Sequence, residues 1–169
     1  IKEQAEQITT LVGNLKEISS VSFITYGASN IILEEMISRQ PNWLKNTPIN
    51  KIIEINPLIN GSKICQKLSS FSLLRFVLGK MLSDLTPDNI KKFHHKIALD
   101  IRVITTQPSW LQKLISLLLV AKCPKHSIEE IKTWCGAKSV KALSVTSNRA
   151  LQSASISDAI AYFLSENKS

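Results

Sequence analysis

The N-terminal segment alternates apolar and polar residues with the spacing of an amphipathic helix. The apolar positions follow the three- and four-residue steps of a heptad seam at Ile8, Leu11, Leu15 and Ile18. The pattern continues with a phase shift to Met36, and Pro41 ends it because proline disfavours helix at the preceding residue. We therefore predict a long amphipathic helix over residues 1–39. It either forms a coiled coil that makes the chain a homo-oligomer or packs on its own domain.

Prolines interrupt the segment that follows. Residues 40–61 hold three of the six prolines. Within this segment, Thr47-Pro48 has the form of a helix start, with threonine as the cap and proline in the first turn, and it predicts a short helix to Ile55. We interpret residues 40–61 as a semi-rigid connector.

The remaining segment, residues 62–169, combines helical spacing of apolar residues with clear helix starts. Thr86-Pro87-Asp88 supplies a cap, a proline suited to the first turn and an acid that favours the helix dipole. Ser127 and Glu130 have the spacing of a capping box. We therefore predict a compact basic helical bundle here, and an all-α fold for the chain. The assignment is weakest over residues 98–106, because their β-branched side chains favour a strand.

Positive charge is concentrated in the centre of the chain. Residues 62–141 hold fourteen Lys and Arg against five Asp and Glu, a balance of +9 within a total of +8. Residues 1–61 contribute five against six, and residues 142–169 contribute two against two. Segregated charge of one sign attracts acidic partners, so we expect an acidic protein or ribonucleoprotein, or nucleic acid directly.

The expected helix after Pro87 would carry much of this charge on one face. Its outward residues are Lys91, Lys92, His95, Lys96 and Arg102. Such a face gains affinity for phosphates through counterion release, and the same face suits an acidic peptide. The alternative interpretation is a solvated surface that keeps the protein soluble.

A second basic cluster lies in a segment that resembles a helix-turn-helix in outline. A short helix, residues 128–135, meets Gly136, and a second helix is expected from Lys138 to Leu151. The second helix of such a motif reads the major groove, so Lys138 and Lys141 are candidate DNA contacts. Two short helices joined by glycine also occur in helical domains that bind no nucleic acid.

Catalytic and metal-binding patterns are missing from the sequence. It has no phosphate-binding loop and no Gly-x-Ser-x-Gly, so we expect no catalytic site and no cofactor. Cys123 and His126 have the spacing of half a zinc site, but no second close pair completes it, and we expect no metal. Three irregularly spaced cysteines favour a reducing compartment, and no apolar run is long enough for a membrane span. We expect an intracellular, cytoplasmic protein, with the nucleus as an alternative.

The predicted plan of oligomerising helix, connector and small basic helical domain resembles the phosphoproteins of nonsegmented negative-strand RNA viruses. The resemblance is one of architecture, and no residue is carried over from it. It implies a polymerase cofactor that engages a nucleoprotein–RNA template. We therefore expect a non-enzymatic, multimerising adaptor that binds an acidic partner, and the alternative is a nucleic-acid-binding helical domain.

Overall fold

A four-stranded parallel sheet forms the centre of the computed structural model, which describes residues 1–69, 83–95, 97–110, 113–114, 117 and 126–166. The strands are β1 (Val21–Tyr26), β2 (Ile49–Ile55), β3 (Ile101–Gln107) and β4 (Ser139–Thr146), and their order in the sheet is β1-β2-β3-β4. All three neighbouring pairs are parallel. The chain therefore has an α/β fold, and the all-α prediction is wrong.

The described helices surround this sheet. The α-helices are α1 (Lys2–Gly13), α2 (Ser29–Ser38), α3 (Lys63–Leu68), α5 (Pro87–Phe93), α7 (Ile128–Cys135) and α8 (Ala154–Ser165). Two 3-10 helices, η1 (Asn42–Lys45) and η2 (Ser147–Gln152), follow α2 and β4. Within the described residues, no helix has both the length and the apolar content that a membrane crossing requires.

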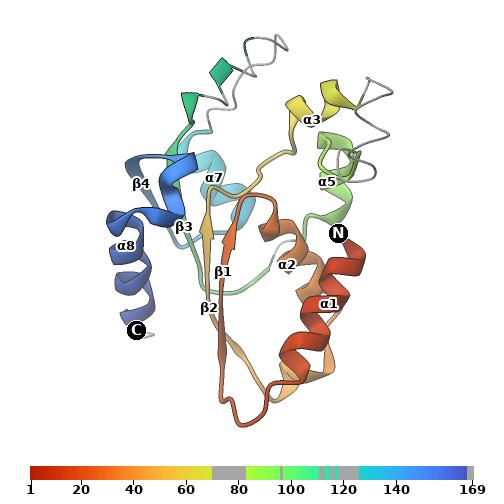
Figure 1. The fold of residues 1–169 in the computed structure, drawn as a ribbon. Coiled ribbons are helices and arrows are strands. Elements are labelled where there is room, and N and C mark those ends of the chain that lie inside the picture. Colours follow the sequence, from red (N-terminus) through yellow and green to blue (C-terminus); the bar gives the residue numbers. More distant parts are fainter. Residues whose placement is uncertain (70–82, 96, 111–112, 115–116, 118–125, 167–169) are drawn as a thin grey trace.

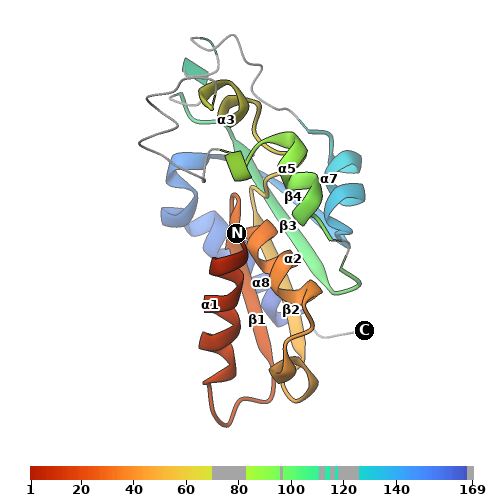
Figure 2. The same cartoon turned by 90° about the vertical axis from the view of Figure 1, so that its right-hand side faces the viewer.

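The strand order explains how the helices are distributed. Each strand is followed in the sheet by its successor in the chain, so right-handed crossovers place the connecting helices on one face. Helices α1, α2 and α7 contribute to the core on that face, whereas α8 follows β4 and packs on the opposite face. Figure 1 views this arrangement close to edge-on, with α8 on one side of the strands and α1 and α2 on the other. Figure 2 looks onto the sheet from the side of α1 and α2.

Each face of the sheet has its own core. The larger core joins buried residues of β2 and β3 to α1, α2 and α7 and includes Ala5, Leu33, Met36, Ile52, Val103 and Ile131. The smaller core lies under α8 and includes Ile53, Ile55, Ile104, Ile156, Ala159 and Phe163. Because β2 and β3 are covered on both faces, isoleucine and valine side chains lie on both faces of each strand, as is typical of parallel sheets, and Lys51, Glu54 and Arg102 are the charged exceptions.

The long N-terminal helix and its coiled coil are corrected by the structure. Helix α1 ends at Gly13, so Ile18 lies outside it, and β1 follows. Ala5 and Val12 are the buried residues of α1, whereas Leu11 is 66% exposed. The expected seam is therefore not one continuous helical stripe, and the coiled-coil prediction is wrong. Self-association of the chain by other means stays a prediction.

Three further segments expected to be helical are strands. Residues 49–55, 101–107 and 139–146 form β2, β3 and β4. Strands buried on both faces give continuous apolar runs that resemble a buried helix, and this ambiguity explains the errors at β2 and β3. In β4, Val140 and Leu143 lie three residues apart, which mimics helical spacing, yet they pack on opposite faces of the sheet.

Two of the locally encoded helix starts are confirmed, whereas the start expected at Thr47-Pro48 is wrong because residues 49–55 form β2. Helix α5 begins at Pro87 after Thr86, as the sequence predicts. Helix α7 begins after Ser127, whose hydroxyl accepts a hydrogen bond from the backbone N–H of Glu130 at 3.1 Å. Parts of two further predicted helices, residues 70–82 and 118–122, lie outside the described residues.

Candidate binding site

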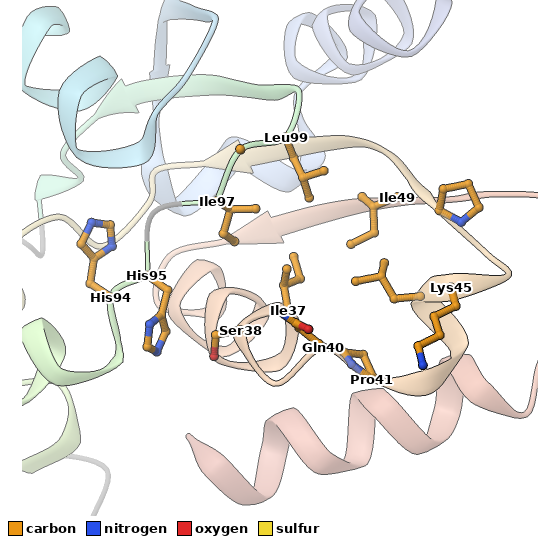
Figure 3. Close-up of a pocket in the computed structure, with 13 residues that line it drawn as sticks. Ile37, Ser38, Gln40, Pro41, Lys45, Ile49, His94, His95, Ile97 and Leu99 are labelled. Atoms are coloured by element: carbon orange, nitrogen blue, oxygen red, sulfur yellow. The ribbon is translucent and has the colours of Figure 1, made fainter.

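A pocket of about 850 Å³ lies at the amino end of β2 and β3. Its walls come from the end of α2, from η1, from the start of β2 and from the segment that leads into β3. The residues that line it are Ile37, Ser38, Gln40, Pro41, Leu44, Lys45, Pro48, Ile49, His94, His95, Ile97, Ala98 and Leu99. Figure 3 shows these side chains converging from the four segments.

The pocket has aliphatic walls and basic groups at its two ends. Ile37, Ile49 and Leu99 lie between the ends, while His94 and His95 lie at one end and Lys45 at the other (Figure 3). No Asp or Glu is among the described residues that line it. A ligand in this pocket would meet apolar walls and one exposed cation, Lys45, whereas the two histidines are paired with carboxylates of α2.

Two consecutive glutamates of α2 hold the histidine end in place. Helix α5 ends at Phe93, and the chain then presents both histidines to α2. The carboxylate of Glu34 lies 2.7 Å from Nδ1 of His94 and accepts the backbone N–H of His95 at 3.0 Å. The carboxylate of Glu35 lies 3.3 Å from Nε2 of His95. These contacts fix the direction in which the chain leaves α5.

Glu35 belongs to an ion-pair chain that reaches α1. Arg39 donates to Glu35 through Nε at 3.0 Å and Nη2 at 2.8 Å, and its Nη1 donates to Glu6 at 2.8 Å. Burial acts to raise the pKa of Glu35, but its hydrogen bonds with Arg39 and His95 outweigh burial and hold the pKa below its ordinary value. Glu35 is therefore ionised at neutral pH and orients His95.

Behind the histidine end lies a buried acid cluster, defined here as Glu34, Glu54, His94 and Cys135. Glu54, the residue before the last of β2, is 2% exposed and shares a hydrogen bond with the Cys135 thiol. Burial raises the pKa of Glu54 to about 7, and the charge of Glu34 adds to this shift. The ring of His94 stacks on Trp134 with centroids 4.1 Å apart, so α7 closes the cluster.

The thiol of Cys135 is poorly suited to nucleophilic chemistry. Burial raises its pKa far above the ordinary value, and the nearby charges of Glu54 and Glu34 add to the shift. Because the thiolate is the reactive species, Cys135 stays an unreactive thiol at neutral pH.

The buried acid cluster has further polar neighbours with unused hydrogen-bonding capacity. Thr25 pairs in register with Glu54, and Asn30 precedes Glu34 by about one turn of α2. Within the described residues, Thr25 Oγ1, Asn30 Nδ2 and Glu54 Oε2 are buried without a hydrogen-bond partner. Unpaired buried polar atoms are costly, so this layer is less firmly held than an apolar core would be.

The carboxyl end of the sheet, where open α/β sheets usually bind ligands, is tied together by its own side chains. The amide of Asn56 donates to Thr106 Oγ1 at 2.7 Å, and its oxygen accepts the backbone N–H of Thr106 at 2.7 Å. The Tyr26 hydroxyl donates to the carbonyl of Ser147 at 2.7 Å. The pocket at the opposite end is therefore the stronger candidate.

The structure separates the residues expected to share one basic face. Lys91 and Lys92 are exposed on α5, and His95 lies in the pocket against Glu35. Lys96 lies outside the described residues. Arg102 is on β3, on the side of the sheet covered by α8, where it pairs with Asp100 at 2.9 Å and Glu166 at 3.0 Å. The single outward helical face is thus wrong, since the helix ends at Phe93.

The second basic cluster is not a helix-turn-helix. Lys138 precedes β4 and lies 3.4 Å from Asp100, and Lys141 lies in β4 over the ring of Tyr162. Because residues 139–146 form a strand, the expected recognition helix is absent from this described segment. Lys141 is still exposed, so its contact with a partner stays a prediction.

Sequence reasoning found His95 and missed the acids that position it. A signal for Glu54 exists in the run Ile52-Ile53-Glu54-Ile55, since a charged residue inside a run of isoleucines needs a partner or a function that explains its burial. Nothing local links Glu34 to His94, because sixty residues separate them.

No protein-family model matches the chain, and no curated protein matches it. Within the described residues, no group of three or more His, Cys, Asp or Glu side chains could hold a metal ion. The pocket is therefore the feature of the described residues that bears most directly on function.

Proposed function

We propose that the chain is a non-enzymatic binding domain that recognises an acidic protein segment carrying apolar side chains. The observation that carries the proposal is the pocket with aliphatic walls and the exposed Lys45 at one end. Its volume of about 850 Å³ is large enough for several side chains of a bound segment.

Charge near the pocket supports an acidic partner. Lys45 is exposed at one end of the pocket, and Lys91 and Lys92 are exposed on α5 just before the histidine end. Such cations raise the rate of encounter with an acidic partner and fix its orientation, whereas the aliphatic walls supply the burial that holds it.

The site offers little to a catalytic mechanism. Glu34 occupies Nδ1 of His94, whose ring stacks on Trp134, and the Cys135 thiol is held protonated by burial. The turn between β1 and α2 contains a single glycine, Gly27, whose N–H donates to the carbonyl of Ile55 at 3.0 Å. That backbone donor is therefore already used and does not serve a phosphate.

Binding can be tested with defined peptides in a fluorescence anisotropy assay. The probe is a fluorescein-labelled peptide of alternating glutamate and leucine, with serine replacing leucine in one control peptide and glutamate in another. We expect the parent peptide to bind and both controls to bind at least about tenfold more weakly, because each control lacks one of the two recognition elements. If the serine-for-leucine peptide binds as tightly as the parent peptide, the apolar pocket does not recognise the peptide and the proposal is wrong.

Variants of the chain locate the site. Lys45→Glu and Ile97→Asn should each weaken binding of the parent peptide by about tenfold, through charge reversal and loss of an apolar wall. Lys132→Glu on α7 and Leu11→Asn on α1 are matched controls, because both side chains are exposed outside the pocket. A mixed-sequence single-stranded RNA tests the alternative partner: if RNA displaces the peptide and binds Ile97→Asn normally, the partner is nucleic acid.

A further inference from the structure

We propose that the buried acid cluster is a proton-operated latch for the pocket. With Glu54 protonated, the cluster holds the pocket wall formed by residues 97–99 against the sheet, and loss of that proton releases the wall. The first half of this proposal concerns the chain alone, and only its effect on ligand affinity rests on the proposed function.

The buried acid cluster adjoins the pocket, because His94 belongs to both. His94 both lines the pocket and contacts Glu34 at 2.7 Å, and Ile97, three residues later in the sequence, lines the same pocket. Ile97 and Leu99 pack against the larger core. Gly136, the residue after Cys135, lies beside Ile97, since a Cβ there would be 3.8 Å from the Ile97 carbonyl oxygen. The wall is thus attached at both α2 and α7.

The chemistry of Glu54 makes this attachment sensitive to a proton. The titratable groups that face Glu54 are Glu34 from α2, His94 from the segment after α5 and Cys135 from α7. Its register partners, Thr25 of β1 and Val103 of β3, carry no charge. Ionised Glu54 would therefore place a second carboxylate beside Glu34 in a buried layer.

Among the described residues, ionised Glu54 is stabilised by its hydrogen bond with Cys135 and by the charge of His94, and burial outweighs both. Glu54 Oε2 has no hydrogen-bond partner among the described residues, and the thiol of Cys135 is a weak donor. A buried charge without good partners is relieved by admitting water or by moving the groups around it. Repulsion between the carboxylates of Glu34 and Glu54 acts where α2 meets β2, next to His94, so we expect it to loosen this contact and the pocket wall that follows in the chain.

The latch can be read through Trp134, because its ring stacks on His94. Trp43→Phe and Trp110→Phe leave Trp134 as the remaining tryptophan of the three. We expect its fluorescence, and the hydrogen exchange of residues 97–99 corrected for intrinsic rate, to change between about pH 5.5 and 8.5 with a midpoint near 7. Exchange should be slow at the acid end and faster at the alkaline end.

Two variants and one control decide whether Glu54 is responsible. Glu54→Gln and Glu54→Leu both remove the ionisable group, so both should keep slow exchange at residues 97–99 throughout the pH range. Glu129→Gln, on the exposed side of α7, should behave as the parent. If the transition persists unchanged in both Glu54 variants, another group drives it and the latch is wrong. A flat profile in the parent overturns the proposal equally.

The glutamate–leucine peptide tests the coupling to binding. In the parent protein, affinity should fall about tenfold from pH 6 to pH 8 if the released form does not bind, because Glu54 is then about nine-tenths ionised. Glu54→Gln should lose clearly less affinity over the same interval. If the Trp134 transition depends on Glu54 but the peptide binds at no pH, the latch stands and the proposed function fails. If the peptide binds with the same pH dependence in both proteins, the proposed function stands and the latch fails.

Discussion

The ammonium group of Lys51 in β2 lies 2.6 Å from the carbonyl oxygen of Phe163 in α8. It also donates to the carbonyl oxygens of Leu164 and Glu166, and its side chain is almost completely buried. The last carbonyls of a helix lack intrahelical donors and carry the negative end of its dipole. A buried cation from the sheet therefore caps α8 and fixes where it docks.

Replacement of this cation should loosen α8. Lys51→Met keeps the buried stem but removes the donor, so we expect the free energy of unfolding to fall by about 1–3 kcal/mol. Urea denaturation gives this value, and amide exchange should rise first in the last turn of α8. Lys132→Met, at an exposed position of α7, is the control and should change stability by less than about 0.5 kcal/mol. Unchanged exchange in α8 would contradict the role of Lys51.

Gly27 and Gly61 form a matched pair for a test of close packing. Both have positive φ, 59° and 73°. A Cβ at Gly61 would lie 2.6 Å from backbone atoms of Pro87, whereas a Cβ at Gly27 meets nothing within 4 Å. Gly27→Ala should cost about 1 kcal/mol through backbone strain alone, and Gly61→Ala should cost at least about 1 kcal/mol more. Thermal unfolding of both variants measures the difference, and equal losses would contradict the contact with the start of α5.

Glu54 should make the folded state less stable as the pH rises. Its pKa is about 7 in the folded chain against an ordinary value of 4.5, so between these values the folded state binds a proton that the unfolded state does not. The free energy of unfolding should therefore fall through this window, by about 3 kcal/mol in total, and level off above pH 7. Urea denaturation at several pH values measures the slope.

In Glu54→Gln, the free energy of unfolding should change less with pH, and above pH 7 it should not fall below the value of the parent protein. Because glutamine resembles the protonated carboxyl, the variant should be more stable than the parent above pH 7. A variant that retains the full slope would show that other groups dominate the pH dependence.

Arg102 should contribute most to the free energy of unfolding at neutral pH. Burial acts to raise the pKa of Asp100, but the hydrogen bond and charge of Arg102, with the charge of Lys138, hold the pKa below its ordinary value. A carboxyl with a lowered pKa contributes stability that is lost as the pH falls through the folded pKa. Arg102→Leu should thus cost about 1–3 kcal/mol near pH 7 and less below about pH 4.

Lys138→Leu is the matched comparison for the same carboxyl. Lys138 is 59% exposed and lies 3.4 Å from Asp100, so its loss should cost no more than about 0.5 kcal/mol. Urea denaturation of both variants at neutral and acid pH tests the contrast. Equal effects of the two substitutions would contradict the dominance of Arg102.

Two local signals predicted helix starts correctly, whereas the local signal at Thr47-Pro48 did not, because residues 49–55 pair as β2. The capping serine at Ser127 and the proline at Pro87 act within one helical turn, and both helices begin where expected. The strands depend on partners far along the chain: Ile52 pairs with Ile101, and Val103 pairs with Val140. Apolar spacing alone cannot distinguish such a buried strand from a buried helix, so the sheet was missed.

The candidate site was predictable only in part for the same reason. His95 stood out because it adjoins exposed lysines in the sequence. The contacts that define the site join α2 to the segment after α5, and β2 to α7, and no local pattern records either pairing. The pocket also depends on the parallel sheet, because its floor is the amino end of β2.

Helix α8 has a consequence for the order in which the chain is synthesised. Ile53, Ile55 and Ile104 are covered by residues that follow them by at least forty positions, in η2 and α8. During translation the first three strands can therefore assemble while this isoleucine strip is still open to water and to other nascent chains. Such a strip is a binding surface for chaperones and a starting point for aggregation. The strip is covered only when α8 docks, and the contact of Lys51 with the last turn of α8 holds that cover in place.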